Sequence, residues 1–200
     1  IERIREKSRI FQTKYISEYC HDYLQHSFDH PDRAIDILNN WLLDDEQKQY
    51  LINNNWTLFF LYASIHLCNI GLSSPSLLEE DDLRVNSREE LLNLRAKRGK
   101  LILEKFWNEL GIEDSSQASI LAKVCLMQQD ISIEDTKIKR RIPYRQTGQS
   151  VNLQFIIGCI RLLYELDLNQ PRIPFLLERF LSGEQETQNV FEFEGIGPHG

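Results

Sequence analysis

The stretch Leu58 to Ser74, LFFLYASIHLCNIGLSS, is apolar around nearly its whole circumference when it is drawn as a helix. A helix without a consistently polar face belongs in the interior of a fold. This one is too short to span a bilayer, which needs about 20 apolar residues. Asn53 to Asn55 supply N-cap candidates before it, and Gly71 is a natural residue just past its C-terminal end. The stretch therefore predicts a buried central helix around which the chain packs.

Three polar residues, His66, Cys68 and Asn69, gather toward the C-terminal end of this helix. Buried polar groups need partners, so these are either satisfied members of the core or remnants of a site. His66 and Cys68 are only two positions apart and would point in different directions from a helix. A Cys–His or Ser–His nucleophile at this point is therefore the least favoured of the possible chemistries.

Length and composition place the chain among ordinary globular proteins. Its 200 residues suggest one domain with room for an extension. A formal net charge of −7 argues against a nucleic-acid or anionic-membrane partner. The widely spaced Cys20, Cys68, Cys125 and Cys159 suggest reduced core thiols in a cytoplasmic protein. The sequence opens at Ile1 inside a helical pattern, which suggests a piece of a longer protein.

Hydrophobic periodicity predicts further helices and an all-α fold. These helices are expected over residues 1–24, 29–43, 87–110, 116–129 and 151–166. Ser87 and Glu90 have the spacing of a capping box, and Ser150 is expected to cap the last helix. The acidic run Asp44 to Glu46 and the polar segments 72–86 and 131–149 are expected to be solvated connections. The alternative for the last segment is that its basic residues receive phosphates; these are Lys137, Lys139, Arg140, Arg141 and Arg145.

The segment HLCNIGL, His66 to Leu72, resembles the signature helix of the HD-domain metal-dependent phosphohydrolases, in which an apolar run ends in His-Asp-Ile-Gly. Cys68 and Asn69 stand where that His-Asp pair would be. The segment Asp29-His30-Pro31 resembles the start of the family's earlier helix, and its first metal-binding His falls near Arg33 or Ala34. The resemblance implies an HD-like helical bundle around the central helix.

Two later segments continue the resemblance in the expected order. RAKRG, Arg95 to Gly99, is similar to the family's histidine-rich helix, with Arg98 kept and Arg95 in place of a histidine. The next helix ends near Gln128, where the family carries a His ligand. The segment VNLQFIIGCIRLLYELDLNQPRIP resembles the closing helix, in which Arg161, Leu162, Leu166, Asp167 and Arg172 match and Tyr164 replaces the metal-binding Asp.

The departures from the family decide the expected function. The ligands become Arg33 or Ala34, Cys68, Asn69 and Tyr164, so no set of three good metal ligands remains. We expect a catalytically inactive HD-like domain that regulates, senses a ligand or binds a protein. The alternative is an active phosphohydrolase that acts on a nucleotide with atypical metal ligands. Candidate remnants of the site are His66, Cys68, Asn69, Arg95, Arg98, Gln128, Arg161, Tyr164 and Asp167. No metal, cofactor, nucleic acid or membrane is expected.

Domain boundaries and partners follow from the same resemblance. We expect an N-terminal amphipathic helix over 1–28, the HD-like domain over 29–174, and a truncated extension over 175–200. Similar domains sit beside ATPase or signalling modules, which are the expected partners, with a nucleotide as a possible ligand. If Arg95 replaces a ligand histidine, it either pairs with a carboxylate such as Asp167 or, with Arg98, presents a fork to a phosphate.

Overall fold

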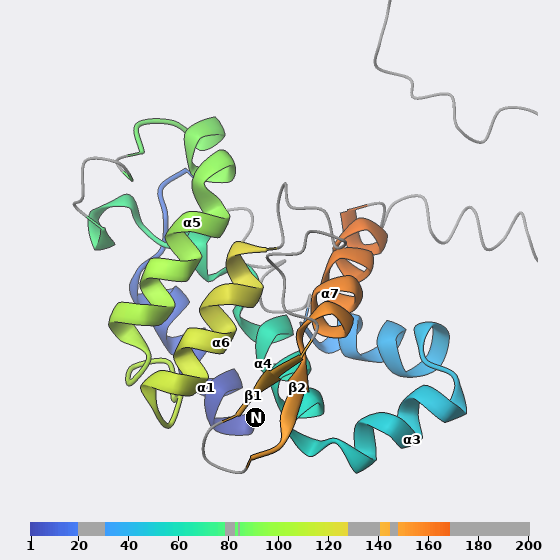
Figure 1. Cartoon of the computed structure of the whole chain (residues 1–200). Helices are drawn as coiled ribbons and strands as arrows, with labels where there is room; N and C mark the ends of the chain where they lie inside the picture. The colour runs from blue at the N-terminus through green and yellow to red at the C-terminus, as the bar shows by residue number, and fades with distance from the viewer. Residues whose placement is uncertain (20–30, 79–82, 84, 128–140, 145–147, 169–200) are drawn as a thin grey trace, which may run out of the picture. The chain divides into compact units, whose positions relative to one another are not determined.

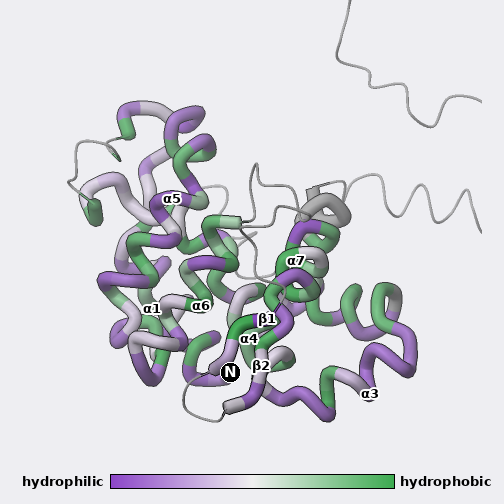
Figure 2. The backbone as a smooth tube through the Cα atoms, viewed as in Figure 1, coloured by the Kyte–Doolittle hydropathy of each residue, from purple (hydrophilic) through white to green (hydrophobic). Residues whose placement is uncertain are grey.

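Helix α4, Asn55–Leu67, forms the centre of the fold, as predicted (Figure 1). Its buried residues are Thr57, Phe60, Leu61, Ala63, Ser64, Ile65, His66 and Leu67. The side chain of Asn54 caps the helix by accepting a hydrogen bond from the Thr57 N–H at 3.2 Å. Figure 2 shows α4 in the green of hydrophobic residues, whereas α3 is mostly purple. Helix α4 is thus buried on almost every side, as expected for a helix without a polar face.

The structure is a computed structural model that describes residues 1–19, 31–78, 83, 85–127, 141–144 and 148–168, with the backbone alone at 41 and 164–168. It divides into one unit of Ile1–Glu165 and a second of Leu166–Gly200. All the packing below belongs to the first unit. Among the described residues, none of the helices is both long and apolar enough to cross a membrane.

The neighbours of α4 are mostly helices. They are α1 (Glu2–Lys14), α3 (Asp45–Asn53) and α6 (Ser115–Leu126), together with strand β2 (Ser150–Asn152). Helix α5 (Arg88–Phe106) runs alongside α6 (Figure 1). Helix α7 (Leu153–Leu168) adds Ile156, Ile157, Ile160 and Leu163 to the same core. A helix over 31–37 continues into the π-helix η1 (Leu38–Leu42), and η2 (Ile70–Leu72) and η3 (Pro75–Leu77) are short 3-10 turns. The all-α prediction is confirmed.

Two predicted helix boundaries near the N-terminus are wrong. Helix α1 ends at Lys14, whereas the spacing of its aromatic residues predicted a helix to residue 24. Asp44 to Glu46 is not a solvated turn but the start of α3. The Asp44 carboxylate accepts a hydrogen bond from the Gln47 N–H at 2.7 Å, and the Gln47 side chain accepts one from the Asp44 N–H at 3.2 Å. This capping box supplies partners for two N–H groups at the helix start.

The other helix starts show mixed outcomes. Ser87 caps α5 as predicted, although the Glu90 carboxylate reaches back to the N–H of Asn86 instead of Ser87. Ser150 does not cap α7, because it lies in β2. Asn152 takes that place and accepts a hydrogen bond from the Phe155 N–H at 3.2 Å. Helix α6 begins one residue early, at Ser115, and both α5 and α6 end a few residues before their predicted ends.

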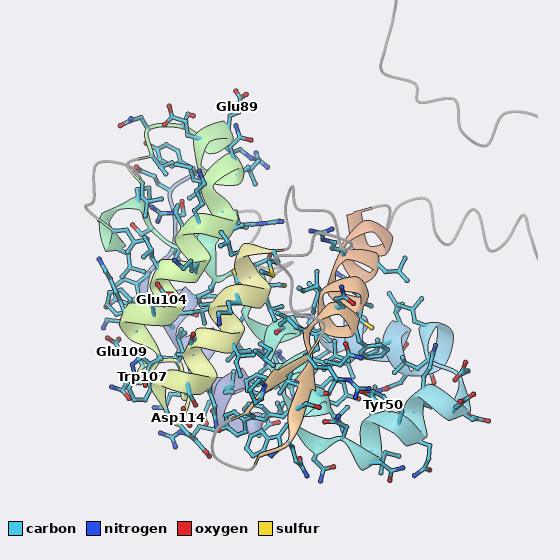
Figure 3. The ribbon with its side chains drawn as sticks, viewed as in Figure 1. Tyr50, Glu89, Glu104, Trp107, Glu109 and Asp114 are labelled. Atoms are coloured by element: carbon cyan, nitrogen blue, oxygen red, sulfur yellow. The ribbon has the colours of Figure 1, made fainter. Side chains whose placement is uncertain are left out.

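A short antiparallel hairpin lies between α6 and α7 in the chain and was not predicted. Strand β1 (Arg141–Pro143) pairs with β2, and Tyr144, directly after β1, is fully buried. Its ring packs against Trp56 of α4 with centroids 4.3 Å apart. Its hydroxyl accepts a hydrogen bond from Gln117 at 3.0 Å and donates one to Asp114 at 3.3 Å. Figure 3 shows Asp114 at the start of α6, so one tyrosine joins the hairpin to two helices.

Candidate functional site

The end of α4, the middle of α5 and the end of α6 meet at a cluster of Cys68, Arg95 and Cys125, which we call the thiol–arginine cluster. All three side chains are buried, with exposed fractions of 3%, 6% and 3%. Cys68 and Arg95 both lie close enough to Cys125 to influence its ionisation. Two of these residues come from segments that resemble the family's metal-binding motifs. The fold therefore brings those segments together.

Two glycines, Gly71 and Gly99, allow the segment after α4 to contact the backbone of α5 directly. A Cβ on Gly71 would lie 1.9 Å from the Arg95 carbonyl oxygen, and a Cβ on Gly99 would lie 2.4 Å from Cys125 Sγ. Any larger residue at Gly71 would overlap backbone atoms of α5. The prediction that Gly71 ends α4 as a left-handed residue is therefore wrong. Gly71 lies inside η2, and among the described residues the glycines with positive φ are Gly111 and Gly148.

Arg98 organises the segment that follows the cluster. Its side chain is fully buried, and its guanidinium donates only to backbone carbonyls in the part of the chain that the structure describes. The acceptors are Gly71 (3.2 Å), Ser73 (3.0 Å), Ser74 (2.9 Å) and Leu83 (3.0 Å). Burial lowers the pKa of Arg98. Since its donors are turned toward the protein's own carbonyls, this geometry favours a structural role over phosphate binding.

His66 faces away from the thiol–arginine cluster, in agreement with the predicted divergence of His66 and Cys68. The charged groups near it are Arg5 and Arg9 of α1 and Asp32 of the helix over 31–37. Burial lowers the pKa of His66 to about 4, and the guanidinium of Arg5 adds to this effect. The imidazole is therefore neutral at pH 7, and it belongs to the contact between α1 and α4.

The donor set at the cluster does not fit the metal centre that the family resemblance implies. Burial raises the pKa of the Cys125 thiol to about 12, so in the metal-free chain it is a neutral thiol at pH 7. The Cys68 thiol donates a hydrogen bond to the Ile65 carbonyl at 3.2 Å. Asn69 offers only a neutral amide, and Arg95 adds a positive charge. Within the described residues, no group of three His, Cys, Asp or Glu side chains could hold a metal ion.

The remaining predicted residues are only partly described. Arg161 of α7 donates from Nε to the Met127 carbonyl at 3.1 Å and from a second nitrogen to the same oxygen, which places α7 at the end of α6. Gln128 and the side chains of Tyr164 and Asp167 lie outside the described residues, so the proposed Arg95–Asp167 pair stays a prediction. Cys125 was not among the predicted site residues, because an isolated thiol on an apolar helix gives no sequence signal.

Comparison with known protein families identifies the family of this chain. The family model described as HD-CE matches residues 18–195, which is most of the chain but excludes α1. No curated protein and no solved structure matches the sequence.

Proposed function

Because the chain belongs to the HD-CE family, an HD-domain-type family, we propose that it is a catalytically inactive HD-like domain that regulates a larger protein. It would do so by sensing a ligand or by contacting a neighbouring ATPase or signalling module. A cytoplasmic location accompanies this proposal, since the described Cys68, Cys125 and Cys159 are all free thiols.

One observation carries the proposal: the buried Arg95, which stands where the family resemblance implies a metal-binding histidine, lies beside the protonated thiol of Cys125. Metal-dependent phosphoryl transfer needs a cation held by deprotonated or neutral ligands, which then activates water. Arg95 repels a divalent cation, and neither Cys125 nor Asn69 supplies a negative charge. The site is therefore suited to structural pairing or to holding an anion, but not to generating a hydroxide nucleophile.

The second candidate is an active phosphohydrolase with atypical ligands. Asn69 Oδ1 supports it, because this oxygen is buried and receives no hydrogen bond in the described part of the chain. An unsatisfied buried acceptor is costly and suggests an unseen partner. That partner could be a cation or a hydrogen-bond donor on a ligand, so this oxygen alone does not favour hydrolysis.

Elemental analysis and hydrolysis assays separate the two candidates. The purified chain is dialysed against Mn²⁺, Ni²⁺ or Zn²⁺ and assayed with nucleoside mono-, di- and triphosphates. We expect less than about 0.1 equivalent of metal and no metal-dependent turnover. Stoichiometric metal and turnover that disappear in Asn69→Ala, but persist in the Cys159→Ser control on α7, would establish the active enzyme instead.

An Arg95→Met variant tests whether the site holds an anionic ligand. If Arg95 only pairs with the protein, the variant loses thermal stability in plain buffer. If Arg95 binds a phosphate, the variant keeps its stability but loses the increase in melting temperature that a nucleotide produces in the parent chain. Lys97→Met, which removes an exposed charge on the same helix, is the matched control.

A further inference from the structure

Helix α1 is an addition to the region that the family shares. It spans Glu2–Lys14, whereas the family match begins at residue 18. Its buried residues are Ile4, Ser8, Phe11 and Gln12, of which only two are apolar. Phe11 packs against Phe106 at the end of α5, with ring centroids 5.7 Å apart. The apolar attachment of α1 is therefore small beside that of α4.

Polar contacts at the rim complete the attachment of α1. Arg5 and Arg9 both reach one carboxylate oxygen of Asp32, at 2.8 and 3.5 Å. Lys14 reaches Glu109, in the turn after α5, at 3.7 Å (Figure 3). The side chains in these pairs are about one-third to two-thirds exposed, and such pairs contribute little each. Helix α1 is thus attached through few apolar side chains and through exposed pairs, which is the kind of attachment that local opening can break.

His66 of α4 lies close to charged side chains of α1. Its exposed fraction is 6%, and burial disfavours a positive charge on its ring. The charged groups around it are Glu2, Arg5 and Arg9 from α1 and Asp32 from the helix over 31–37. Among the described residues, the charges of these two cations and two carboxylates balance one another. Protonation of the imidazole would therefore add an unbalanced positive charge to the contact between α1 and α4.

We propose that α1 is a releasable strap, and that a positive charge on His66 detaches it while the rest of the domain stays folded. The added charge lies next to Arg5 and Arg9 and cannot be hydrated while α1 covers it. Helix α4 cannot move, because it is the centre of the core. Helix α1 can, and its departure opens the imidazole to water. Helix α1 lies outside the residues that the family model matches, whereas His66 lies within them.

Hydrogen exchange of the full 200-residue chain, resolved by segment, tests the proposal at pH 7. His66→Arg places a permanent charge in the seat, and His66→Gln is the uncharged control. We expect α1 amides in His66→Arg to lose protection while α5 and α6 keep theirs, and His66→Gln to resemble the parent chain. The proposal fails if α1 stays protected in His66→Arg, or if α1, α5 and α6 lose protection together.

Acid provides a second test that needs no new charge. With a pKa of about 4 in the closed state and 6.5 in the open state, His66 binds more protons when α1 is released. Lowering the pH therefore favours release between those two values. The equilibrium constant for opening α1 should rise about 20-fold from pH 7 to pH 5, after correction for intrinsic exchange. His66→Gln should abolish this rise. An equal rise in His66→Gln would assign the effect to the carboxylates and overturn the proposal.

Discussion

Replacement of Arg98 by methionine tests the arrangement around η2 most directly. Methionine keeps much of the side-chain volume but removes every donor to the carbonyls of residues 71, 73, 74 and 83. A buried carbonyl that loses its partner costs about 1–3 kcal/mol. The change also removes a buried charge, and the Ser74 carbonyl is close enough to the surface to gain a water, which offsets part of this cost. We expect the free energy of unfolding to fall by about 3–5 kcal/mol.

Urea unfolding followed by far-UV circular dichroism at pH 7 measures this loss. Lys97→Met is the control on the same helix, because Lys97 is exposed and should change stability by less than about 0.5 kcal/mol. Arg98→Lys keeps the charge but replaces a planar fork with a single ammonium, and it should lose about 2 kcal/mol. If Arg98→Met remained within about 1 kcal/mol of the parent chain, the four hydrogen bonds would not hold the 71–83 segment.

Three further substitutions probe the packing around α4. Gly71→Ala should cost more than about 3 kcal/mol in urea unfolding, because the methyl group would meet backbone 1.9 Å away. Gly158→Ala is the control on α7, because nothing lies within 4 Å of its new methyl group. It should raise the free energy of unfolding by up to about 1 kcal/mol. Equal effects of the two substitutions would contradict the close contact between Gly71 and α5. Tyr144→Phe should lower the free energy of unfolding by about 1–2 kcal/mol by removing both hydroxyl hydrogen bonds, and an unchanged melting temperature would argue against that network. Ser64→Ala should raise the melting temperature by a few degrees, about 1 kcal/mol, because the Ser64 hydroxyl is buried and lacks a partner among the described residues; a destabilised variant would mean that a partner exists.

The centre of the fold could be predicted from sequence because burial on all sides leaves a direct mark on composition. The absence of a polar face over residues 58–67 has few explanations other than a core helix. The cap at Ser87 could also be predicted, because a cap and the apolar residues that follow it are close together in the sequence. The Asp44–Gln47 capping box has the same local form. Its spacing indicates a helix start, whereas the acidic charge of residues 44–46 alone predicts a solvated connection.

Long-range features could not be predicted in the same way. Strands of three residues have too little alternation to be recognised, and the pairing of β1 with β2 becomes visible only in the fold. Gly71 illustrates the same limit, since a glycine after a helix indicates a cap unless a second helix crosses it. The candidate site stays a prediction, although two of its predicted residues, Cys68 and Arg95, lie in one cluster. The chemistry of the thiol–arginine cluster depends on Cys125, which lies on α6, outside the segments that resemble family motifs.

The hydrogen bonds between the start of α4 and β2 have a consequence for how the chain is made. Asn54 bonds to Ser150 and Thr57 to Asn152, across 96 and 95 positions of sequence. At about 5–20 residues per second, translation leaves α4 without these partners for roughly 5–20 s after it emerges. The most apolar helix of the domain is therefore exposed during synthesis until the last strand arrives. This interval is when the nascent chain is most open to aggregation and to chaperone binding.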